Sequence, residues 1–89
     1  MPNDFAVYWK EDATMNDIQS MIKELEKIGP RPVSQEDDYL EATLDWGTST
    51  RDVNNLQGRL NGVSHNKVES IDVITAGAVP EVGQEAGTR

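Results

Sequence analysis

The chain has 89 residues, and its sixteen acidic side chains against eight basic ones give it a formal net charge of −8. A chain of this length forms one domain with a small core, which favours a groove, an open sheet face or a dimer interface over a deep internal cavity as the functional site. The acidic balance argues against direct nucleic-acid binding, because contact with a phosphate backbone requires clustered Lys and Arg.

Cysteine is absent from the chain, which excludes disulfides and thiolate metal sites. No apolar run approaches the roughly 18 residues of a membrane span. The N-terminal residues have neither the basic region nor the apolar region of a signal peptide. We therefore expect a cytoplasmic protein that works without a cofactor and does not bind a membrane.

A first β-strand is predicted over residues 5–10, because every second side chain there is a large apolar one. The predicted core-facing set is Phe5, Val7 and Trp9. The residues between them and at the end of the strand point to the opposite side of the sheet, and these are Ala6, Tyr8 and Lys10.

A helix is predicted over residues 15–28, which carry one apolar stripe at helical spacing. The stripe consists of Met15, Ile18, Ile22, Leu25 and Ile28, with Met21 at its margin. Thr14 and Asp17 match a capping box at the start of the helix. Gly29 is expected to end it in the left-handed conformation.

Two strands are predicted after this helix, over residues 33–36 and 39–46. The first is short, polar and preceded by proline, which is typical of a sheet edge. The second alternates cleanly. Its expected core-facing residues are Leu40, Ala42, Leu44 and Trp46, and its outward residues are Tyr39, Glu41, Thr43 and Asp45. Trp46 is expected to pack with Trp9 near one end of the core.

A second helix is predicted from the apolar spacing of Val53, Leu56 and Leu60. Ser49 with Asp52 matches a capping box at its start, and Gly62 is the expected left-handed residue at its end. Gly58 lies inside this helix, so we expect the helix to be weak or closely packed at that point.

A last strand is predicted over residues 68–76, with Ile71 and Val73 pointing inward and Ser70, Asp72 and Ile74 pointing outward. Residues 77–89 lack periodicity and contain many small residues, so we expect a disordered tail there. The predicted domain thus covers residues 1–76.

The resulting order of strand, helix, strand, strand, helix and strand predicts an α+β fold, a ferredoxin-like two-layer sandwich. Each helix has a single apolar stripe, so both helices must cover one face of the four-stranded sheet. Right-handed crossovers then place the first and third strands at the centre and the other two at the edges.

No catalytic motif accompanies this fold, so we expect a protein that is not an enzyme, although a dimeric α+β enzyme is a third reading. The sole histidine, His65, follows Ser64 in a loop, where neighbouring side chains rarely face each other. The acidic turn of residues 36–38 lacks the spacing of a calcium loop.

The outward sheet face is the candidate partner-binding site. Its residues are Tyr8, Lys10, Tyr39, Glu41, Thr43, Asp45, Asp72 and Ile74. A polar, acidic surface with embedded aromatics is typical of an interface that has aromatic anchors inside a polar rim, and the alternative is a face that is simply solvated. We predict a small acidic regulator or inhibitor that binds a protein partner, including one that itself binds nucleic acid.

The element order, the Leu60-Asn61-Gly62-Val63 segment and the closing Val68-Glu69-Ser70-Ile71-Asp72-Val73 segment resemble regulatory modules of the ACT type. The resemblance covers about residues 5–76. It implies a homodimer that binds an amino acid or another small ligand at its interface. An ACT-like ligand-binding homodimer is therefore the alternative function.

Overall fold

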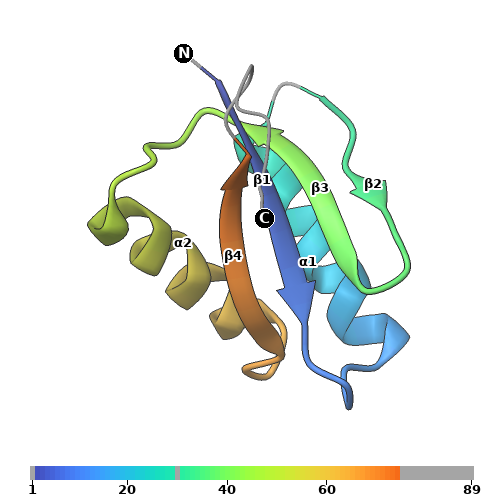
Figure 1. Ribbon diagram of the computed structural model, residues 1–89. Helices are drawn as coiled ribbons and strands as arrows, with labels where there is room; N and C mark the ends of the chain where they lie inside the picture. Colours follow the sequence, from blue (N-terminus) through green and yellow to red (C-terminus); the bar gives the residue numbers. More distant parts are fainter. Residues whose placement is uncertain (1, 30, 75–89) are drawn as a thin grey trace, which may run out of the picture.

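The computed structural model describes residues 2–29 and 31–74 (Figure 1). Their elements are β1 (Asn3–Trp9), α1 (Met15–Ile28), β2 (Ser34–Gln35), β3 (Tyr39–Leu44), α2 (Thr50–Val63) and β4 (Val68–Ile74). This is the predicted element order, and the α+β class is confirmed. The tail expected over residues 77–89 lies outside the described residues.

The four strands form one antiparallel sheet in the order β2-β3-β1-β4. β1 and β3 are therefore central, as the crossover rule predicts. Phe5 of β1 lies opposite Ala42 of β3 on one side and opposite Val73 of β4 on the other. The register with β4 shifts between Tyr8 and Trp9, so that Trp9 lies opposite Val68 and Glu69 has no partner in the pairing.

Both helices pack on the same face of the sheet. In Figure 1, α1 passes behind β1 and β3, and α2 lies beside β4. Side chains from β1, β3, β4, α1 and α2 form one buried cluster. Its members are Phe5, Val7, Ile18, Met21, Leu25, Leu40, Ala42, Leu44, Leu56, Leu60, Val68 and Ile71. No element of the described ranges covers the opposite sheet face.

The apolar stripe of α1 is rotated relative to the prediction. Met21, expected at the margin, is completely buried, whereas Met15 is 59% exposed. Ile22 is only half-buried. Successive helical residues point about 100° apart, so Met21 and Ile22 cannot both face the sheet directly. The residues of α1 that face the sheet directly are Ile18, Met21 and Leu25.

The start of α1 is capped as predicted. The Thr14 hydroxyl accepts the Asp17 backbone N–H at 3.2 Å, and the Asp17 carboxylate accepts the Thr14 backbone N–H at 3.0 Å. Together these two bonds satisfy donors that the helix itself leaves unpaired. In α2, the Ser49 hydroxyl accepts the Asp52 N–H at 3.1 Å.

The two predictions of left-handed glycines at helix ends are wrong. Gly29 ends α1 in an extended conformation, with φ −96° and ψ 151°. Glycine is required at this position for a different reason, because a Cβ there would lie 2.4 Å from the Thr43 carbonyl oxygen. Gly62 lies inside α2, and the left-handed residues are instead His65 and Asn66, with φ 57° and 60°.

The expected packing of Trp9 against Trp46 is also wrong. β1 and β3 are antiparallel, so Asn3 at the start of β1 pairs with Leu44 at the end of β3. Trp46 consequently lies at one end of β1 and Trp9 at the other. The indole N–H of Trp46 donates instead to the Asp52 carbonyl of α2 at 2.7 Å.

Candidate functional site

The uncovered side of the sheet displays one set of side chains from the three longest strands, which we call the open face. Strand alternation and the register place nine residues on it, namely Asp4, Ala6, Tyr8, Tyr39, Glu41, Thr43, Ser70, Asp72 and Ile74. Three of them are carboxylates and none is basic. The open face is therefore acidic, and Glu41, Ser70, Asp72 and Ile74 are its exposed members.

A pair of tyrosines lies at one end of the open face. Tyr8 and Tyr39 are directly opposite each other on β1 and β3. Their ring centroids are 5.2 Å apart, with the ring planes at 35°. A cross-strand aromatic pair of this kind contributes about 0.5–1.5 kcal/mol beyond simple burial. Both side chains are half-buried, so the pair forms a positioned aromatic surface at the edge of solvent.

Negative charge surrounds the tyrosine pair. Burial raises the pKa of Tyr8 above its ordinary value of 10, and the carboxylates of Asp72 and Asp38 raise it further. The pKa of Tyr39 is raised by burial and then by the neighbouring carboxylates of Glu36, Glu41, Asp38 and Asp37. Both effects oppose a tyrosinate charge. At neutral pH the pair is thus a neutral aromatic surface inside a negative field.

Two carboxylates flank the centre of the open face. Ala6 is paired with Glu41 on one side and with Asp72 on the other. Neighbouring strands lie about 4.8 Å apart, so the Cα atoms of the two acidic residues are about 10 Å apart. Ala6 is 4% exposed, whereas Glu41 and Asp72 are exposed. The small alanine leaves the two carboxylates as the most prominent groups of this row.

Asp4 is a member of the open face that the sequence reading missed. The Thr43 hydroxyl donates to the Asp4 carboxylate at 2.7 Å across β1 and β3. The predicted strand began at Phe5, but the alternation continues backward through Asp4 to Asn3. Following this alternation toward the N-terminus is the signal that would have found it.

Six of the eight residues predicted for the site lie together on the open face, whereas Lys10 and Asp45 lie just beyond the ends of their strands. Lys10 follows the end of β1, where its backbone N–H donates to the Lys67 carbonyl at 2.8 Å. β3 ends at Leu44, and the Asp45 N–H turns toward the Ile28 carbonyl at 3.5 Å. The placement of Asp45 on the sheet face is therefore wrong.

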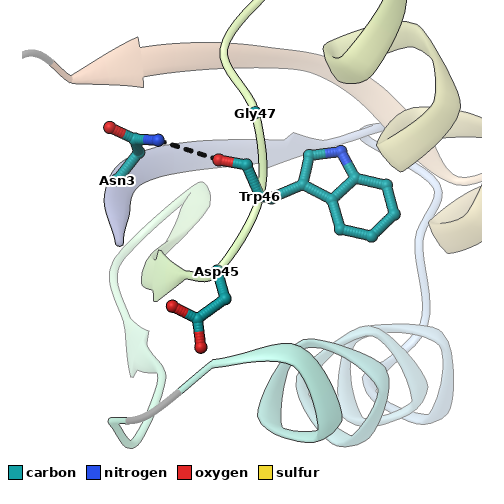
Figure 2. A pocket seen from close by; sticks show the side chains of 4 residues that line it. All are labelled: Asn3, Asp45, Trp46 and Gly47. Atoms are coloured by element: carbon teal, nitrogen blue, oxygen red, sulfur yellow. Dashed lines mark hydrogen bonds between the residues drawn. The ribbon is translucent and has the colours of Figure 1, made fainter. Parts of the chain in front are cut away.

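Asp45 lines a separate open pocket of about 350 Å³ with Asn3, Trp46 and Gly47 (Figure 2). The Asn3 amide donates to the Trp46 carbonyl at 2.8 Å, and the Asp45 carboxylate points away from the indole. One exposed carboxylate in an open pocket does not provide the nucleophile, base and orienting group of a catalytic site.

The Ser64–His65 sequence does not form a catalytic pair. The Ser64 side chain is buried, and its hydroxyl donates to the Leu60 carbonyl at 2.8 Å. His65 points instead to α1, with Nδ1 at 2.8 Å from the Asp17 carboxylate. The Thr14 N–H, followed by His65, lowers the pKa of Asp17 to about 2. These are structural contacts between the loop after α2 and the start of α1.

The described residues contain neither a candidate metal site nor a candidate membrane span. Residues 2–29 and 31–74 contain no group of three or more His, Cys, Asp or Glu side chains arranged to hold a metal ion. Neither of the two described helices is long and apolar enough to cross a bilayer.

Charge is distributed unevenly between the helices and the rest of the described chain. α1 and α2 together hold four acidic and four basic residues, so the helical layer is neutral in sum. The strands and loops of the described ranges hold ten acidic and three basic residues. The net negative charge of this part of the chain thus belongs to the sheet and its connections. The described strands alone hold four acidic residues and no basic one, a charge that attracts a basic surface.

Comparison of the chain with family models, with curated proteins and with solved structures gives no match. A functional proposal therefore rests on the geometry and charge of the described residues.

Proposed function

We propose that this protein is a non-catalytic regulator or inhibitor that binds a protein partner with a basic surface through its open face. The observation that carries the proposal is the juxtaposition of the Tyr8–Tyr39 pair with Glu41 and Asp72 on a sheet face that no described element covers. Tyrosines supply large contact area together with a polar end, and they are enriched among the residues that dominate binding energy.

A ferredoxin-like fold is part of this proposal. The antiparallel order β2-β3-β1-β4, with both helices on one side, supports that assignment. In such a two-layer arrangement one sheet face is buried by helices and the other is left for an added layer. The proposed partner supplies that layer.

Charge selects the class of partner. A surface with Asp4, Glu41 and Asp72 and no basic residue attracts Lys and Arg side chains and repels phosphate groups. A second copy of the chain would bring the same carboxylates against its own, which is unfavourable. We therefore place a basic protein surface on the open face, in preference to nucleic acid or a homodimer.

The ACT-like ligand-binding homodimer stays a prediction. Its ligand loop corresponds to the connection between β1 and α1. In that connection the Asp12 carboxylate pairs with the Lys67 ammonium at 2.7 Å, and Thr14 and Asp17 bond to each other. Side chains engaged in this way are less free to receive a ligand, so binding of a protein partner is the better supported function.

A titration with a short basic peptide, followed by amide chemical shifts of the labelled protein, tests the proposal. We expect the largest shifts in β1, β3 and β4, and a Kd that weakens as salt is raised. The Glu41→Gln/Asp72→Asn variant should weaken binding by about three- to tenfold, the effect of two surface charge pairs.

The matched control is Glu11→Gln/Glu26→Gln, which removes two exposed carboxylates away from the open face. It changes the net charge by the same amount and should leave the Kd within about twofold if local charge decides binding. Equal weakening by both variants, or peptide shifts confined to the helical layer, would overturn the proposal.

A further inference from the structure

We propose that the open face selects arginine over lysine, with a partner guanidinium lying against the Tyr8–Tyr39 pair and donating to Glu41 or Asp72. This inference rests on the proposed function and names the side chain that the face recognises. Its three supports are the geometry of the aromatic pair, the neighbouring carboxylates that form no ion pair within the described residues, and an arginine of this chain that is already bound in the same manner.

The aromatic pair suits a flat cation. Two rings 5.2 Å apart and tilted by 35° offer an extended π surface whose position is set by two central strands. A guanidinium is planar and weakly hydrated, so it stacks on such a surface at a small desolvation cost. An ammonium is compact and strongly hydrated, and gains less from the same contact.

The carboxylates stand at the right positions to accept the N–H groups. Ala6 lies two residues before Tyr8 on the same face, and Glu41 and Asp72 flank Ala6. Each carboxylate is thus a diagonal neighbour of Tyr8, about 7–8 Å away between Cα atoms, within reach of a long side chain bound on the ring. Neither carboxylate forms an ion pair with any residue in the described part of the chain.

An arginine of this chain is already in contact with both an aromatic ring and a carboxylate. The Arg59 guanidinium lies 5.8 Å from the centroid of the Trp46 ring, and its Nε donates to the Glu24 carboxylate at 2.5 Å. One arginine thereby contacts an aromatic ring and a carboxylate at once. The open face presents the same two chemical groups and lacks the arginine, and we assign that missing part to the partner.

Two peptides of equal length and charge, one carrying only arginines and the other only lysines as basic residues, test the inference at fixed ionic strength. Calorimetry gives both Kd values, and amide shifts locate both peptides. We expect the arginine peptide to bind at least about fivefold more tightly, because the cation–π contact and the planar donor set favour it.

The Tyr39→Leu variant keeps an apolar side chain and removes one ring, so it should bring the ratio of the two Kd values close to one. The Tyr39→Phe variant keeps the ring and should preserve the preference. The Phe variant keeps the inference testable if the Leu variant does not fold, which circular dichroism reports.

The outcomes separate the two proposals. Equal binding of both peptides on the open face overturns the arginine preference and leaves the proposed function intact. A preference that survives Tyr39→Leu overturns the role of the tyrosine pair. Binding of neither peptide to the open face overturns both proposals.

Discussion

Nδ1 of His65 lies 2.8 Å from Oδ1 of Asp17, a contact between residues 48 positions apart in the sequence. An ionised carboxylate can only accept a hydrogen bond, which assigns the proton to Nδ1. The same carboxylate accepts the Thr14 N–H, so it both caps α1 and holds the loop before β4. His65 takes part from a left-handed backbone with φ 57°, a conformation that residues other than glycine seldom adopt.

This contact predicts a specific response to acid. The pKa of Asp17 is about 2, below its ordinary value of 3.8, because the Thr14 N–H and then His65 stabilise the charged form. Its contribution to stability is therefore complete above about pH 4 and is lost as the pH falls toward 2. Thermal unfolding of Asp17→Asn should show a lower Tm than wild type at pH 6 and a difference that vanishes near pH 2. A difference in Tm that does not change with pH would contradict a stabilising role of the ionised Asp17 carboxylate.

The tyrosine pair predicts a shifted alkaline titration. The chain has only two tyrosines, so near-ultraviolet absorbance of tyrosinate reports Tyr8 and Tyr39 alone. We expect both midpoints above pH 10, because burial and neighbouring carboxylates oppose ionisation. Asp72→Asn should lower the midpoint of Tyr8. Asp12→Asn, which removes a carboxylate paired with Lys67, serves as the control and should leave both midpoints in place.

Two glycine substitutions should change stability in opposite directions. A Cβ at Gly29 would lie 2.4 Å from the Thr43 backbone oxygen, so Gly29→Ala forces the backbone to shift and should cost about 1–3 kcal/mol. A Cβ at Gly58 meets nothing within 4 Å. Gly58→Ala should therefore stabilise α2 by about 0.5–1 kcal/mol. Denaturant unfolding measures the free energy of unfolding of both variants. A loss of stability in Gly58→Ala would contradict the finding that the space around Gly58 is open.

The rotation of α1 is testable with two methionines. Met21 is fully buried, and Met21→Ala should reduce the free energy of unfolding by about 2–5 kcal/mol. Met15 is 59% exposed, and Met15→Ala should change it by less than about 0.5 kcal/mol. Urea titrations of the two variants compare them directly. If both substitutions reduced the free energy of unfolding by similar amounts, Met15 would face the core, as the apolar spacing alone predicts.

Local patterns predicted the elements well because they depend on neighbours in sequence. The 3.6-residue period predicted α1 with the bounds that the structure shows, and Thr14 with Asp17 predicted its cap. Alternation in β3 predicted that Tyr39, Glu41 and Thr43 share one face. Most residues of the candidate site could therefore be predicted from the sequence alone.

The tertiary structure decided where segments meet and where they end. Antiparallel pairing of β1 with β3 placed Trp46 beside Asn3 instead of Trp9, and the contact of the Asp45 N–H with the Ile28 carbonyl accompanies the end of β3. His65 illustrates the same limit, since its partner Asp17 lies in another element. Periodicity determines which way a side chain points along its own strand or helix, whereas register, termination and loop contacts depend on groups brought together only by the folded chain.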